Sequence, residues 1–334
     1  MWQPERLLRA LRVLERGDPV PTRYHLQHSL FDILSFNMVK VPSAVSFFAL
    51  HALLGGKGIQ GRTIPRQDTP VWRTLPATPA LPSPISDVKI AVDGVELWMQ
   101  KYNEDTSQTP LVLDHGGLGY SAYFGDVLSR LIAKGHYVIA VDRRGHGRST
   151  FKDDDVFTFD MFANNIYEQL KSAGVGKYNV VGWSDGGATT ISALLNSTIS
   201  PTIEKAFLFG TFMVPEDSNA TFPNTDIYSQ FVSRCGQEYK QLQPNANFTL
   251  FANKVGTLEA TLPQFTTAQL GTISGSKVRI VGAEFDEAVN LDVPDKLHAA
   301  IPGSSLVMLK NVSHFAPLQD PDQFTAAVED FFYA

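Results

Sequence analysis

A serine lies between glycines in Gly182-Trp183-Ser184-Asp185-Gly186, directly after the apolar pair Val180-Val181 and before a helical pattern over 187–195. A nucleophilic serine needs a strained turn between a strand and a helix, and small neighbours keep that turn free of clashes. The N-terminus of the following helix also favours the negative charge that develops during nucleophilic attack. The motif therefore predicts that Ser184 lies on a sharp strand-to-helix turn.

Residues 86–334 alternate strand-like and helix-like patterns. The apolar segments typical of strands are 88–92, 95–99, 111–113, 137–141, 180–181, 206–209, 278–281 and 306–309. The helical patterns are 123–134, 160–173, 187–195, 291–300 and 321–333. Apolar strands that alternate with helices predict a mostly parallel α/β sheet, buried on both faces. The long gap between strands at about 213–274 predicts an inserted cap.

The first 85 residues lack this alternation and predict a domain boundary. Residues 1–60 begin with leucines on one helical face, and their uncharged stretch over 41–56 has 16 residues, fewer than the roughly 18 that a spanning helix needs. We expect a helical extension packed on the main domain. Attachment to a membrane surface and a signal anchor stay open as alternatives. An intracellular location is favoured, and a membrane-associated or luminal location stays open with these alternatives. The six prolines of residues 61–85 predict an extended linker.

Composition excludes several classes of protein. The chain has 28 basic and 34 acidic residues, for a net charge of −6, and this leaves no basic field for nucleic acid. Its single cysteine, Cys235, excludes an intrachain disulfide and a cysteine-built zinc site. The sequence has no phosphate loop, dinucleotide fingerprint or metal-ligand spacing, so no cofactor or metal is expected. We expect a small-molecule partner, and nothing indicates an oligomeric state.

A serine nucleophile needs a base that is itself oriented by an acid. His314 follows the last predicted strand, where a loop can reach the turn that carries Ser184. The acid is expected after the preceding strand, where Glu284, Asp286 and Glu287 cluster. Asp286 is favoured by its position relative to the strand, and Glu284 is the alternative. The chain order Ser184, Asp286, His314 is the order expected for a serine nucleophile on this kind of sheet.

A second glycine motif, His115-Gly116-Gly117-Leu118-Gly119, directly follows another predicted strand. Its glycines let backbone N–H groups approach a reacting oxygen. We expect the N–H groups of Gly117 and Asp185 to form an oxyanion hole, in which each donor stabilises the transition state by about 3 kcal/mol. His115 is expected to brace this loop, and His146, in the turn at 142–149, is expected to be structural.

With these motifs placed, residues 86–334 resemble the α/β-hydrolase superfamily over nearly their whole length. The matching parts are His115-Gly116-Gly117, the turn at 142–149, the serine motif, Asp286 and His314. The serine motif and the modest cap look most like the biphenyl-hydrolase-like, valacyclovirase-type serine esterases. The resemblance implies an α/β-hydrolase fold, with a mostly parallel eight-stranded sheet, helices on both faces and an inserted helical cap. It does not cover the N-terminal 85 residues.

The resemblance also implies acyl transfer. Ser184 would attack the carbonyl of a carboxylic ester or a lactone, His314 would move the proton, Asp286 would orient the imidazole, and an acyl-enzyme would form. One alternative uses the same triad for carbon–carbon bond hydrolysis or for acyl transfer to another nucleophile in a specialised, for example biosynthetic, pathway. Another is a non-catalytic binding protein of this fold, which the loss of a triad member would favour; all three members are present.

The substrate contacts are expected near the two glycine motifs, from Trp183 and Leu118. Asp185 has two interpretations, a carboxylate that attracts an amine-bearing substrate and an acid favoured at a helix N-terminus, and the second is preferred. The aromatic and sulfur-bearing residues of the cap either line a pocket or bury the cap against the sheet, with burial slightly favoured. They are Phe212, Met213, Phe222, Tyr228, Phe231, Tyr239, Phe248, Phe251 and Phe265.

Overall fold

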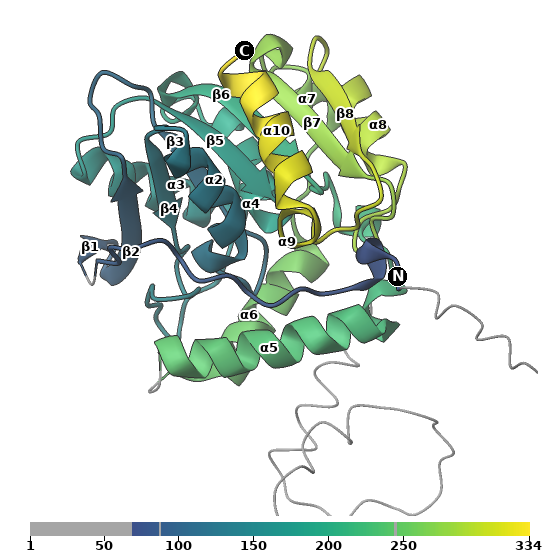
Figure 1. Ribbon diagram of the computed structural model, residues 1–334, viewed down its shortest axis with the longest axis horizontal. Helices are drawn as coiled ribbons and strands as arrows, with labels where there is room; N and C mark the ends of the chain where they lie inside the picture. The colour runs from purple at the N-terminus through teal and green to yellow at the C-terminus, as the bar shows by residue number, and fades with distance from the viewer. Residues whose placement is uncertain (1–68, 87, 244–245) are drawn as a thin grey trace, which may run out of the picture. The chain divides into compact units, whose positions relative to one another are not determined.

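The computed structural model describes residues 69–334 except 87 and 244–245. The expected extension over residues 1–60 and the first part of the linker, 61–68, therefore lie outside the described residues. Within the described part, eight strands form one sheet in the order β1-β2-β4-β3-β5-β6-β7-β8 (Figure 1). The strands are β1 Lys89–Val92, β2 Val95–Tyr102, β3 Leu111–Asp114, β4 Val138–Val141, β5 Tyr178–Trp183, β6 Ile203–Phe209, β7 Val278–Ala283 and β8 Ser305–Leu309.

Only β2 pairs antiparallel with its neighbours, β1 and β4, and every other pairing is parallel. The mostly parallel eight-stranded sheet of the α/β-hydrolase fold is thus confirmed. Its central strands are apolar without interruption because both faces are covered. In β5, Tyr178 and Val180 belong to one hydrophobic core, whereas Val181 and Trp183 belong to the other, as the two-residue period of a strand requires.

Helices cover both faces of the sheet. The core that contains Val181 is closed by α2 Gly125–Ala133, α9 Ala316–Gln319 and α10 Pro321–Phe332. The opposite core is closed by α3 Phe159–Ser172, α4 Asp185–Leu195 and α8 Val293–Ala300. Among the described residues, no helix is both long and apolar enough to cross a lipid bilayer.

The segment between β6 and β7 is helical. It contains α5 Asp226–Leu242, α6 Phe248–Thr261 and α7 Thr267–Leu270, and α5 and α6 lie together in green, on the side opposite the C-terminus, in Figure 1. All three of these helices begin at side-chain caps, and at α7 Thr266 accepts from the N–H of Gln269. Thr225 accepts from the N–H of Tyr228, and Asn247 accepts from the N–H of Leu250, which satisfies an amide of each first turn.

Short 3-10 helices complete the described elements. They are η2 Val71–Arg73, η3 Ser121–Phe124, η4 Ser200–Thr202, η5 Pro215–Asp217, η6 Phe222–Asn224 and η7 Gly275–Lys277.

Residues 69–86, which we call the strap, lead from η2 to the sheet, in purple in Figure 1. The strap has no helix or strand apart from η2 among its described residues, as its proline content predicts. Its backbone carbonyls instead accept side-chain hydrogen bonds. Arg234 of α5 donates to Leu75 O at 2.9 Å and also to Pro76 O, and Gln319 of α9 donates to Thr74 O at 2.8 Å. The strap is therefore attached to both α5 and α9.

Candidate active site

The turn between β5 and α4 holds Ser184 in a strained conformation. Its φ is 56° and its ψ is −117°, a region that residues other than glycine rarely adopt. The N–H of Ser184 donates to Phe209 O at 2.9 Å, and its carbonyl accepts from the N–H of Gly187 at 2.8 Å. A Cβ atom on Gly182 would lie 2.5 Å from the carbonyl oxygen of Gly186. The glycines therefore let strand and helix approach closely on either side of the serine.

His314 and Asp286 form a buried pair in the loops that follow β8 and β7. Nδ1 of His314 lies 3.0 Å from Oδ2 and 3.1 Å from Oδ1 of Asp286. The backbone N–H groups of Ala288 and Val289 donate to Oδ1 of the same carboxylate at 3.0 and 2.9 Å. Because Nδ1 faces the carboxylate, Nε2 is the imidazole nitrogen that remains for proton transfer.

Ser184 and His314 line the same pocket. Their side chains are not hydrogen-bonded to each other in this structure, and such contacts commonly tighten when substrate binds. Burial lowers the pKa of the His314 imidazole, but the charge and hydrogen bond of Asp286, together with the charges of Glu287 and Asp185, outweigh burial. The pKa of His314 is therefore raised above its ordinary value.

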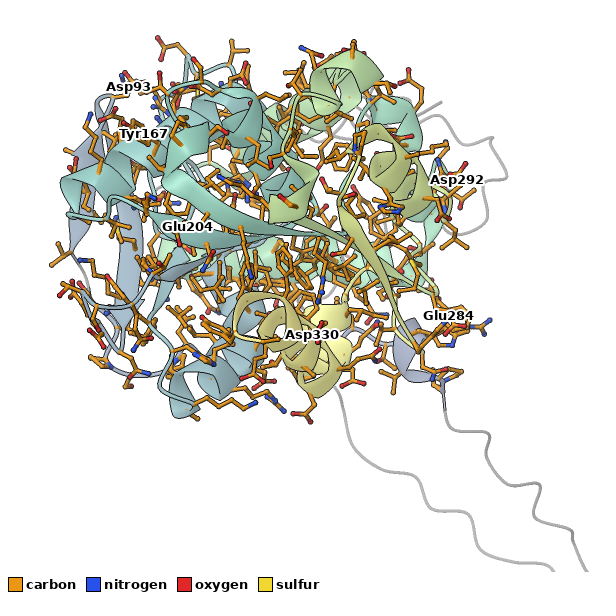
Figure 2. All side chains as sticks on the ribbon, turned by 90° about the horizontal axis from the view of Figure 1, so that it is seen from above. Asp93, Tyr167, Glu204, Glu284, Asp292 and Asp330 are labelled. Carbon is orange, nitrogen blue, oxygen red and sulfur yellow. The ribbon has the colours of Figure 1, made fainter. Side chains whose placement is uncertain are left out.

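The three acids expected at the end of β7 reach different atoms, and only Asp286 faces the imidazole. Glu284 accepts from the backbone N–H of Asn311 at 3.0 Å, and its side chain, 37% exposed, lies at the periphery beside η2 (Figure 2). Glu287 accepts from the backbone N–H of His314 at 3.2 Å. All three acids thus contact the loop that carries the histidine.

The loop after β3 brings Gly117 to the same pocket. In the described part of the chain, the N–H groups of Gly117 and Asp185 have no hydrogen-bond partner, so both can donate to a substrate oxygen. Nδ1 of His115 is bonded to Gly116 O at 2.8 Å, and its Nε2 accepts from the N–H of Arg143 at 3.1 Å. Burial and the charge of Arg143 lower the pKa of His115 well below its ordinary value. His115 is thus a neutral brace of this loop.

Two carboxylates meet beside this loop. A Cβ atom on Gly117 would lie 2.6 Å from Oε1 of Glu259 and 2.7 Å from Oδ2 of Asp185. Neither carboxylate oxygen of Asp185 has a hydrogen-bond partner among the described residues. Burial raises the pKa of both carboxyl groups, the charge of Asp185 raises that of Glu259 further, and the charge of Arg143 opposes both shifts. The guanidinium of Arg143 itself binds Asp114, and no lysine or arginine is among the described residues that line the pocket.

The pocket wall is largely aromatic, and Trp183 and Leu118, the expected substrate contacts, are part of it. Its other aromatic residues are Tyr123, Phe212, Phe222, Tyr228, Phe231 and Phe315. Phe212 and Phe231 are also buried in the two hydrophobic cores, and Met213, Tyr239, Phe248, Phe251 and Phe265 pack in or against the first of these cores. Some cap residues therefore line the pocket and bury the cap at once, whereas others only bury the cap.

Among residues 69–334 without 87 and 244–245, no cluster of three or more histidine, cysteine or acidic side chains could hold a metal ion.

His146 is fully buried against Phe162 and Phe251, and its Nδ1 is bonded to Arg144 O at 3.0 Å. These contacts fit the structural role expected for His146.

Comparisons with known proteins agree with this architecture. Residues 109–253 match a family model described as the alpha/beta hydrolase fold. The human protein named serine hydrolase BPHL is 29% identical over 297 residues, which cover 84% of this chain and 99% of that protein. A proline iminopeptidase of Saccharolobus solfataricus is 25% identical, over 71% of this chain and 89% of the relative.

Solved structures show the same fold. The enol-lactonase from Burkholderia xenovorans LB400 superimposes with a TM-score of 0.59 at 20% sequence identity, over 74% of this chain and 100% of that structure.

Proposed function

We propose that this chain, which has the α/β-hydrolase fold and matches the alpha/beta hydrolase family model over residues 109–253, is a hydrolase that cleaves carboxylic esters or lactones through a Ser184-His314-Asp286 triad. The observation that carries the proposal is the convergence of a strained serine, a carboxylate-bound histidine and two unpartnered amide donors around one pocket. This set matches the parts that acyl transfer needs: a nucleophile, a base with its orienting acid, and an oxyanion hole.

In the proposed reaction, the Ser184 hydroxyl attacks the substrate carbonyl while Nε2 of His314 takes its proton. The tetrahedral oxyanion receives hydrogen bonds from the N–H groups of Gly117 and Asp185, each of which stabilises the transition state by about 3 kcal/mol. His314 then protonates the leaving alcohol, and an acyl-enzyme on Ser184 remains. Water, deprotonated by His314, attacks the acyl-enzyme, and His314 returns the proton to the Ser184 oxygen as the carboxylic acid leaves. Asp286 keeps the imidazole in the required tautomer throughout.

Steady-state and burst kinetics test this function. With 4-nitrophenyl esters we expect a burst of nitrophenolate equal to the enzyme concentration whenever deacylation is slower than acylation. Ser184→Ala lowers turnover by roughly 10³-fold or more, whereas Ser197→Ala, at an exposed serine beyond α4, serves as the matched control. Turnover of Ser184→Ala at the wild-type rate would disprove the proposed nucleophile.

We also propose that preferred substrates carry an amine close to the scissile carbonyl. The support is the pair Asp185 and Glu259, whose oxygens gather beside Gly117 in the pocket. Burial raises the pKa of both carboxyl groups, and a substrate ammonium placed there would favour their ionised forms, since Arg143 is already engaged with Asp114. Unpaired buried carboxylates are costly, and a charge-assisted hydrogen bond to an ammonium offsets that cost.

Two esters that differ only at the amine separate an amine preference from an effect on catalysis of esters in general. Phenylalanine ethyl ester carries the free amine, and its N-acetyl derivative lacks the charge. Glu259→Gln should raise KM for the free amine by roughly tenfold, the effect of one lost charge-assisted contact, and leave the N-acetyl ester unaffected. An equal change for both esters would contradict the amine preference.

A further inference from the structure

Glu287 is a carboxylate beside the proposed triad that the proposed reaction does not use. Its Oε2 accepts from the backbone N–H of His314 at 3.2 Å, and its Oε1 accepts from the hydroxyl of Ser313 at 3.1 Å. It is also the next residue after Asp286, whose carboxylate faces the imidazole. Two adjacent acids therefore hold the same histidine, one through its side chain and the other through its backbone.

The contacts of Glu287 belong to a larger hydrogen-bonded unit. The side-chain oxygen of Gln319 accepts from the backbone N–H of Ser313 at 2.7 Å, and its side-chain nitrogen donates to the Ser313 hydroxyl at 2.9 Å. The same amide donates to Thr74 O of the strap at 2.8 Å. The hydroxyl of Ser313 is thus oriented toward Glu287, and the histidine loop is anchored at several points. A charge on Glu287 acts on a loop that cannot easily move away from it.

We infer that Glu287 is a positioning residue for His314, fixing its backbone and adding a second negative charge that stabilises the imidazolium formed during acyl transfer. This inference rests on the proposed function of Ser184 and His314. When His314 takes the serine proton, the new positive charge lies beside Asp286 and within the field of Glu287. Stabilisation of a charge that exists only along the reaction path lowers the barrier to that step.

The electrostatics of the surrounding groups support this role at pH values above about 7, where Glu287 is ionised. The charged groups that act on His314 are Asp286, Glu287 and Asp185, and all three raise its pKa against the effect of burial. Burial and the charge of Asp286 raise the pKa of Glu287 to about 7, while the charge of His314 acts in the opposite direction. Four aromatic side chains also lie near the imidazole ring, Trp183, Phe209, Phe222 and Phe315.

The test compares Glu287→Gln with Glu284→Gln in the full chain. Both variants remove one acid that accepts a backbone N–H from the histidine loop, but Glu284 bonds Asn311 and not the histidine. We measure kcat and KM for a 4-nitrophenyl ester from pH 5 to pH 9. His314 must be neutral to act as a base, so activity falls as the pH drops through its pKa.

For Glu287→Gln we expect kcat to fall about tenfold at its plateau, with little change in KM. We also expect its acid limb to move to lower pH, because the imidazolium has lost a neighbouring negative charge. Glu284→Gln should keep the wild-type acid limb. A Glu287→Gln enzyme whose kcat and acid limb match those of Glu284→Gln would overturn the inference.

A conservative variant guards against a folding defect in Glu287→Gln. Glu287→Asp keeps the charge and shortens the side chain, so its acid limb should stay near that of the wild type even if kcat falls. An acid limb shifted as far in Glu287→Asp as in Glu287→Gln would contradict the role of the charge. Ser184→Ala, assayed in parallel, separates this result from the proposed function: if it remains active, the function itself fails.

Discussion

At the scale of the residue, the arrangement around Arg143 shows how a buried charge orders the oxyanion loop. The residue is 1% exposed, and its guanidinium donates to the Asp114 carboxylate and to the carbonyls of His115 and Gly116. These carbonyls precede Gly117, so their orientation determines where the Gly117 N–H points. A buried cation here therefore serves both charge balance and loop geometry.

Replacement of Arg143 by an uncharged residue should lower the unfolding free energy. Arg143→Met leaves Asp114 buried without a partner, and loss of one member of a buried ion pair costs roughly 3–5 kcal/mol of unfolding free energy. Urea denaturation measures this loss. The double variant Arg143→Met with Asp114→Leu, which removes both charges, should recover part of the stability. A single variant within about 1 kcal/mol of the wild type would contradict the importance of this pair.

Sequence patterns identify some residues of the site better than others. Ser184, Asp286 and His314 follow strands and fall in a recognisable chain order, so their positions are predictable. Glu259 is not, because it lies on cap helix α6, in no motif, and reaches the pocket only through tertiary packing. In the sequence, Asp185 is interpreted as an acid favoured at a helix N-terminus. Its proximity to Glu259 in the structure is what indicates a role in substrate binding.

At the scale of the element, the strap shows what a proline-rich segment does when it packs against a domain. Proline lacks an N–H and prevents regular structure, so the carbonyls of the strap are left to accept hydrogen bonds from side chains. Arg234, Gln319 and Tyr102 supply these donors. The prolines predict the lack of helix and strand, but Arg234 and Gln319 lie far along the chain from the strap, and their pairing with it cannot be predicted from the sequence.

Loss of one of these donors should loosen the strap. Arg234→Met removes two charge-assisted hydrogen bonds to Leu75 and Pro76, and we expect a loss of roughly 1.5–3 kcal/mol of unfolding free energy. Hydrogen exchange should rise in the amides of the strap. Lys240→Met, at an exposed position of the same helix α5, is the matched control. Unchanged exchange in Arg234→Met would show that the strap is held by other contacts.

The boundaries of the elements follow local signals closely. The Asp93-Gly94 turn joins β1 and β2, with positive φ at both residues, as a tight hairpin requires. The sequence predicts an inserted helical cap over about 213–274 but not the bounds of α5 and α6, because this segment is rich in polar and aromatic residues. They begin at Thr225 and Asn247, whose side chains cap them; these capping signals are visible in the sequence once a helix is suspected there.

At the scale of the whole molecule, buried acids make stability depend on pH. The pKa of Glu259 is raised well above its ordinary 4.5 by burial and by the charge of Asp185. The folded state therefore holds a proton that the unfolded state releases as pH rises above about 4.5. By linkage, the unfolding free energy falls as the pH rises from that value through the folded-state pKa.

Glu259→Gln removes this proton uptake. We expect the variant to be more stable than the wild type at pH 8, and to gain less at pH 5, where the wild-type carboxyl is largely protonated in the folded state. Urea denaturation at the two pH values measures the difference. The same variant should lose affinity for amine-bearing esters, so stability and binding would change in opposite directions. An equal effect on stability at both pH values would contradict a raised pKa of Glu259.

The central claim is that Ser184 is the nucleophile. A fluorophosphonate reacts covalently with an activated serine, and mass spectrometry of the digested protein locates the adduct. We predict one adduct, on the peptide that contains Ser184, in the wild type and in Ser197→Ala, and none in Ser184→Ala. An adduct that persists in Ser184→Ala, or a folded wild type that forms none, would contradict the account.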